Sequence, residues 1–136
     1  MVSATIFVMK IFVLFRVKLI GAIVGAFLSV PARGVRLVSL RPDRGRPQVL
    51  TTDRHLTQGG VELKDERWSG RTLTATVRTV GGFPLTLRVA VPAGFTVRKV
   101  SADGASVTSA LEADGRVLAV TLVGDVSTDV PVTVEF

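Results

Sequence analysis

Residues 71–91 read RTLTATVRTVGGFPLTLRVAV, and this stretch decides the fold class. Apolar and polar residues alternate on both sides of the pair Gly81-Gly82, which is the period of half-buried β-strands. The positions expected to face a core are Leu73, Ala75 and Val77 in the first run and Leu85, Leu87, Val89 and Val91 in the second. The stretch therefore predicts two strands that are joined by a turn at the glycine pair.

The alternation recurs along the rest of the chain, over residues 118–122 and 130–136 and over a shorter run at 35–40. The pairs Asp103-Gly104 and Asp114-Gly115 add turn signals between runs. Strands at roughly ten-residue spacing, with no helical period between them, pair antiparallel because parallel strands need crossover connections. We therefore expect an all-β domain over residues 33–136, an antiparallel β-sandwich of immunoglobulin-like arrangement, with a small barrel as the competing closure.

Residues 1–32 form a separate apolar and basic segment of uncertain structure. Lys10, Arg16 and Lys18 interrupt the apolar run, and the uncharged stretch after them covers residues 19–32. That stretch is short for a membrane span of about 20 residues but typical of the apolar part of a signal peptide. Three interpretations stay open: a signal peptide, a membrane helix, or the first strands of the sandwich. An exported or membrane-associated protein is favoured over a cytoplasmic one, with membrane association through residues 1–30.

Composition excludes several classes of protein. A chain of 136 residues is too short for a catalytic barrel of about 250 residues. It has no cysteine, which excludes disulfides and thiolate zinc sites, and no tyrosine. His55 is the only histidine, and a catalytic triad would need a serine and a carboxylate arranged around it. We predict no catalytic residue, no metal site and no cofactor.

Positive charge is concentrated in the first part of the chain. Residues 1–60 carry nine Lys and Arg against two acids, whereas residues 61–136 carry eight against nine. Five arginines fall close together, at positions 33, 36, 41, 44 and 46. No aromatic residue interleaves them and no nucleic-acid motif surrounds them, so we expect no nucleic-acid partner.

Trp68, the only tryptophan, has two interpretations. An indole ring offers a flat platform for a sugar, but a single tryptophan in a sandwich more often packs against the core. The acids before it, Glu62, Asp65 and Glu66, lie in a stretch that also contains Lys and Arg, which is typical of a solvated face. No evident acid–base pair results.

One segment carries a family resemblance. Residues 38–42 read VSLRP, residues 47–59 read PQVLTTDRHLTQG, and Trp68 follows. This pattern resembles the C-terminal all-β domain of alpha-galactosidase-like (melibiase-type) glycoside hydrolases, in which an antiparallel β-sandwich follows a catalytic (β/α)8 barrel. Residues 80–89 and 91–95 are similar to the same domain, and the likeness covers roughly residues 27–136.

The resemblance implies a non-catalytic accessory domain, because the catalytic carboxylates of that family lie on the barrel. We expect a fragment that lacks the barrel and is not an enzyme on its own. Its partners would be a glycoside hydrolase barrel or a glycan, met through Arg54, His55, Gln58 and Trp68 as domain-interface or sugar-contact residues. A domain without its barrel is also expected to self-associate. The alternative is an exported or membrane-tethered β-sandwich that acts as an interaction or carbohydrate-binding domain.

Overall fold

The computed structural model describes residues 43–54 and 59–136, together with the backbone of two short strands near the N-terminus. These two, β1 (Lys18–Leu19) and β2 (Ala22–Ile23), pair antiparallel within a unit that spans residues 1–38. The three interpretations of residues 1–32, and the strand predicted at 35–40, otherwise lie outside the described residues.

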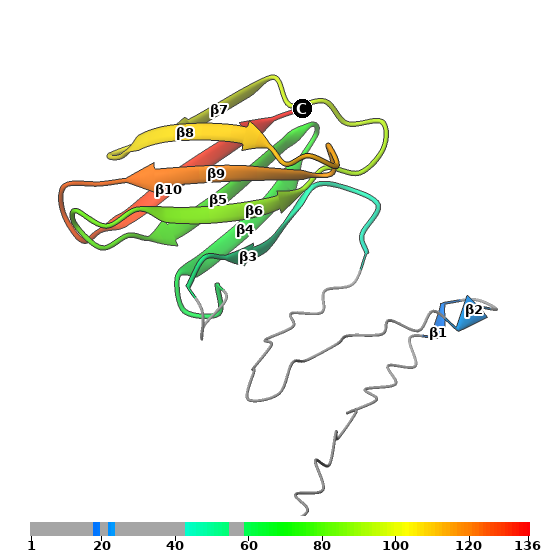
Figure 1. The fold of residues 1–136 in the computed structure, drawn as a ribbon, viewed down its shortest axis with the longest axis horizontal. Coiled ribbons are helices and arrows are strands. Elements are labelled where there is room, and N and C mark those ends of the chain that lie inside the picture. Colours follow the sequence, from blue (N-terminus) through cyan, green and yellow to red (C-terminus); the bar gives the residue numbers. More distant parts are fainter. Residues whose placement is uncertain (1–17, 20–21, 24–42, 55–58) are drawn as a thin grey trace, which may run out of the picture. The chain divides into compact units, whose positions relative to one another are not determined.

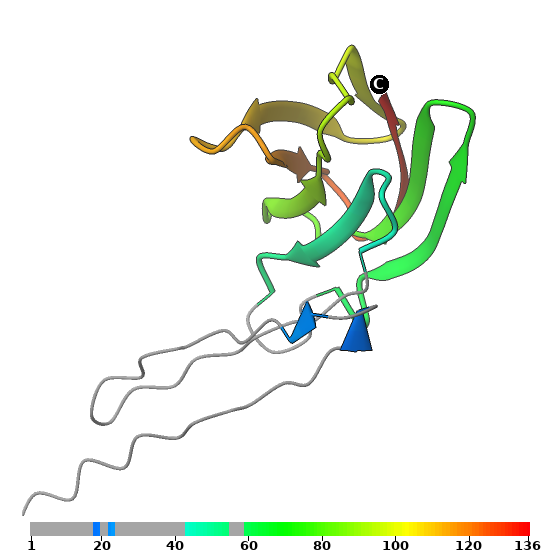
Figure 2. The same cartoon turned by 90° about the vertical axis from the view of Figure 1, so that its right-hand side faces the viewer.

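Residues 43–136 form two four-stranded sheets (Figures 1 and 2). One sheet has the order β3-β6-β9-β8 and the other the order β4-β5-β10-β7, and every neighbouring pair is antiparallel. The strands are β3 (Gln48–Thr52), β4 (Leu63–Ser69), β5 (Thr72–Arg78), β6 (Leu85–Ala90), β7 (Lys99–Ala102), β8 (Ser106–Leu111), β9 (Val117–Val123) and β10 (Asp129–Glu135). The prediction of an all-β antiparallel sandwich is confirmed, whereas its immunoglobulin-like arrangement is not.

The core lies between the sheets and is built from the alternating positions of the sequence. In β5, Leu73 and Val77 are buried while Thr74 and Arg78 are exposed, so one face of the strand is apolar. The buried apolar residues are Val49, Leu73, Ala75, Val77, Leu85, Leu87, Val89, Val91, Leu118, Val120, Leu122, Val130, Val132, Val134 and Phe136. This layer supplies most of the favourable free energy of folding, because removing apolar surface from water is the largest favourable contribution to it.

The part of the chain that the structure describes holds no helix long and apolar enough to cross a membrane.

The loops after β5 and β9 lie side by side at one end of the sandwich (Figure 1), and the turn before β4 is bonded to the end of β5. The turn 59–62 leads into β4, the loop 79–84 joins β5 to β6, and the loop 124–128 joins β9 to β10. Backbone bonds link them, since Arg78 N donates to Glu62 O at 2.7 Å and Gly82 N donates to Gly124 O at 2.9 Å. We call these three segments, with Val123 at the end of β9, the loop end.

Candidate functional site

Two of the four predicted site residues lie within the described part of the chain. Arg54 is the second residue after the end of β3, and Trp68 is on β4. His55 and Gln58 lie outside the described residues. The segment that holds them connects Arg54 with the turn 59–62, which belongs to the loop end.

Arg54 is half-buried where β3 leaves the sheet. Its backbone N–H donates to Thr52 Oγ1 at 3.4 Å. The guanidinium nitrogen Nη2 is inaccessible to solvent and has no hydrogen-bond partner among the described residues, and the same holds for Asp53 Oδ1 next to it. A buried charged atom without a hydrogen-bond partner is costly, so each of these two atoms needs a partner beyond the described residues.

Trp68 is half-buried at the margin of the core and packs in an aromatic cluster. Its ring centroid lies 5.6 Å from that of Phe95, edge-on at 79°, and 5.8 Å from that of Phe136. The guanidinium carbon of Arg46 lies 5.9 Å from the same centroid, within cation–π range. These contacts are those of a packing residue, the interpretation that the sequence favoured.

The structure does not bring Arg54 and Trp68 together. The side chain of Thr52, two residues before Arg54, lies beside Gly59, and Gly59 lies beside Leu63 at the start of β4. Trp68 is five residues further along β4, about 16 Å away at the rise of an extended strand. A single small ligand would therefore not meet both predicted residues at once.

Glu66 corrects one expectation. The sequence predicted a solvated face for it, but Glu66 pairs with Ala75 of β5 and so faces the inside of the sandwich. It is half-buried, and its Oε1 is inaccessible to solvent without a hydrogen-bond partner among the described residues. The spacing of two residues from Trp68 was the signal for this orientation, because residues i and i+2 of a strand share a face.

The loop end carries a feature that the sequence analysis did not single out. Five of the six large hydrophobic side chains that are exposed among the described residues lie there, and the sixth, Leu111, lies on β8. The exposed fractions at the loop end are 67% for Val61, 45% for Val80, 61% for Phe83, 39% for Val123 and 64% for Val126. Apolar residues inside turn segments were the available signal, because turns are usually polar.

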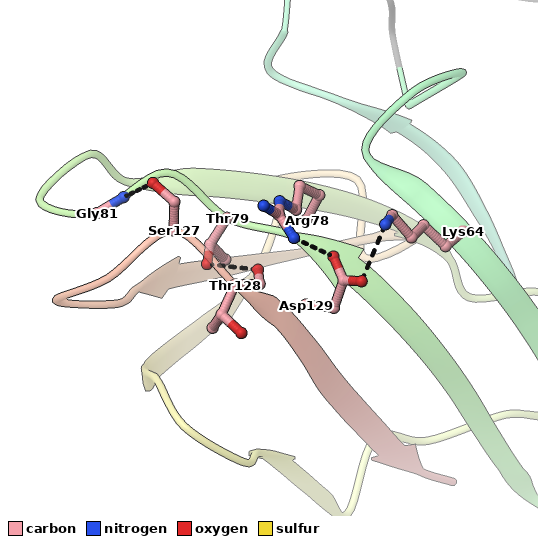
Figure 3. A network of polar contacts seen from close by, with 7 residues as sticks. All are labelled: Lys64, Arg78, Thr79, Gly81, Ser127, Thr128 and Asp129. Atoms are coloured by element: carbon pink, nitrogen blue, oxygen red, sulfur yellow. Dashed lines mark hydrogen bonds and ion pairs between the residues drawn. The ribbon is translucent and has the colours of Figure 1, made fainter.

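Hydrogen bonds hold these loops in one conformation (Figure 3). Thr128 O accepts bonds from Thr79 N at 2.9 Å and from Thr79 Oγ1 at 3.0 Å. Gly81 N donates to Ser127 Oγ at 3.0 Å. Packing adds to this, since a Cβ on Gly81 would lie 2.7 Å from Asp125 O. The apolar side chains are thus presented on a fixed backbone.

A charged group borders the loop end at the start of β10 (Figure 3). Asp129 accepts a bond from Lys64 Nζ at 2.9 Å and one from Arg78 Nη1 at 3.2 Å. The hydrogen bond from Lys64 lowers the pKa of Asp129 below its ordinary value, assisted by Arg78 and opposed by desolvation. This exposed triad joins β4, β5 and β10.

No group of three or more His, Cys, Asp or Glu residues that could hold a metal ion occurs among the described residues. No family model, curated protein or solved structure matches the chain.

Proposed function

We propose that this β-sandwich is a non-catalytic accessory module that docks onto a larger domain through its loop end. The observation that carries the proposal is that Val61, Val80, Phe83, Val123 and Val126 are all exposed at one end of the sandwich. Monomeric proteins seldom expose clustered apolar side chains, and those that do commonly use them to bind a partner.

The loop end has the make-up of a protein interface. Its exposed apolar side chains include Phe83, an aromatic residue of the kind enriched at interfaces. Its border is polar, with the Lys64–Asp129–Arg78 group on one side. Because hydrogen bonds already fix the loops, docking loses little conformational entropy, which favours affinity.

The proposed partner is the catalytic barrel of an alpha-galactosidase-like glycoside hydrolase. Support comes from the resemblance of residues 47–59 to the accessory domain of that family. This segment runs from β3 through Arg54 directly into the turn 59–62, so the family-like residues adjoin the apolar cluster.

A binding experiment with a purified alpha-galactosidase-like barrel tests the proposal. The wild-type chain is expected to bind, and Phe83→Asp is expected to weaken binding at least about tenfold because it places a charge in the interface centre. Ala113→Asp is the matched control, since Ala113 is exposed in the turn between β8 and β9 at the opposite end. Absence of binding, or equal loss in both variants, would contradict the proposal. So would hydrolysis of nitrophenyl galactosides by the chain alone at an enzymatic rate.

A further inference from the structure

The two sheets have four edge strands, and they differ in how they are protected against pairing with another chain. Charged side chains, irregular register and short length are the usual protections. β4 has Lys64, Asp65 and Arg67 together with a register shift, and β3 has a register shift between Val49 and Thr51. β7 is four residues long and begins with a lysine. Three of the four edges are therefore guarded.

β8 lacks each of these protections. Its sequence, SVTSAL, contains no charge and no proline, and its pairing with β9 is regular from Ser106 to Leu111. No described strand pairs with its other side. Five of its six residues are exposed, including Leu111 at 52%. β8 is two residues longer than β7, and Leu111 is its last residue.

From this edge we propose that two copies of the chain pair through β8 in antiparallel orientation, with Ser109 on the twofold axis. A second copy is the occupant because the strand is complementary to itself in one register. Glu112 N donates to Val117 O, so the even-numbered backbone groups of this strand point to β9. In an antiparallel ladder the alternate residues, Val107, Ser109 and Leu111, then direct their N–H and C=O groups to the open side.

Centring the pair on Ser109 gives hydrogen-bond partners to the outward backbone groups and apolar neighbours to the apolar side chains. Ser109 faces Ser109 of the second copy, and Val107 faces Leu111, so all outward groups meet in about six hydrogen bonds. Val107 and Leu111 lie on the core side of the strand, opposite Leu122 and Leu118 of β9. Their pairing covers the exposed Leu111 with an apolar neighbour. The result is a continuous sheet of both copies, in which each residue keeps its own face.

Introducing a charge at Ser109, on the twofold axis, tests this register in the full chain. Ser109→Lys and Ser109→Asp each place like charges directly opposite each other, and each is expected to raise the dimer dissociation constant about tenfold in sedimentation across a dilution series. Mixing the two variants is expected to restore the dimer as a heterodimer. Ala110→Lys, which would face Thr108 on the solvent side, is the control that keeps dimerisation.

Cysteine substitution supplies a second readout, because the natural chain has no cysteine. In Ser109→Cys the two Cα atoms would lie about 5.5 Å apart, within the disulfide range, so mild oxidation is expected to give a covalent dimer. In Leu111→Cys the two thiols would be displaced by about 13 Å along the strands and should not cross-link. A wild-type monomer throughout the dilution series, no heterodimer on mixing, or equal cross-linking of the two cysteine variants would overturn the proposal. These outcomes are independent of barrel binding at the loop end.

Discussion

Replacing Phe136 by alanine tests the packing of the aromatic cluster around Trp68. Phe136 is only 2% exposed, and its ring lies 5.8 Å from Trp68 and 6.0 Å from Phe95, centroid to centroid. The backbone N–H of Phe136 donates to Arg71 O and its C=O accepts from Arg71 Nε, and both bonds remain in the variant because they do not involve the Phe136 side chain. The substitution therefore removes the ring contacts and leaves the end of β10 attached.

The expected loss in the free energy of unfolding is about 3–5 kcal/mol, the usual cost of a buried Phe→Ala change. With a urea dependence of about 1 kcal/mol per molar for a small domain, the unfolding midpoint falls by about 3 M or more. Trp68 is the only tryptophan, so its fluorescence follows the transition directly. A red shift of its native emission is also expected, since the cavity admits water beside the indole ring.

Phe83→Ala is the control, because it is the same chemical change at a side chain that is 61% exposed. Its expected effect is within about 0.5 kcal/mol. If Phe136→Ala leaves too little folded protein, Phe136→Leu keeps most of the volume and is expected to cost less than about 1.5 kcal/mol. Equal losses for Phe136→Ala and Phe83→Ala would refute the reasoning, since only the Phe136 ring is buried and packed against other rings.

Three further outcomes are expected. Gly81→Ala should lower the free energy of unfolding in urea by about 1–3 kcal/mol, because its Cβ would lie 2.7 Å from Asp125 O and force the loops 79–84 and 124–128 apart. The control Ala113→Gly, in an exposed turn, should leave this loop packing intact. Equal binding of both variants to the barrel would count against a preformed loop end. Asp129→Asn should destabilise the fold at neutral pH, and the loss should become smaller on acidification below the ordinary pKa of 3.8. The reason is that the lowered pKa of Asp129 in the folded state contributes stability above that pH, and this contribution disappears as the carboxylate is protonated. Asp103→Asn, with no ion pair among the described residues, is the control in urea unfolding at both pH values. Cell fractionation with mass measurement of the product should find the chain in an exported or membrane fraction, and a full-length cytosolic product would contradict the export interpretation of residues 1–32.

The sequence predicted the central strands well, because one face of an internal strand is buried along its whole length and its residues therefore alternate between apolar and polar. Leu73, Ala75 and Val77 are buried as expected, and so are Leu118, Val120 and Leu122. Turn chemistry was informative as well, since Gly104 and Gly115 have φ angles of 82° and 66°, the left-handed region that the Asp-Gly pairs predicted.

The edge strands could not be predicted in this way. β4 reads LKDERWS and β8 reads SVTSAL, and neither has the apolar alternation of an internal strand. An edge strand is only partly covered, so polar and charged residues occupy positions that would be apolar further inside. For the same reason Glu66 was placed in solvent although it faces inward. The loop end depends on bonds between segments far apart in sequence, such as Gly82 to Gly124, which local patterns do not reveal.

The place of β10 has a consequence for folding during synthesis. This strand lies in the middle of its sheet, paired with β5 on one side and β7 on the other, and it follows every other described strand. Its pairing joins Glu135 to Thr72, so the long stretch of chain between them must form a closed loop before β10 can be added to the sheet. On the ribosome, β7 has no partner in its sheet until β10 emerges, whereas β3, β6, β9 and β8 can already assemble. Completion of the sandwich is therefore a late, slow step, and the nascent chain exposes one half-built apolar layer until then.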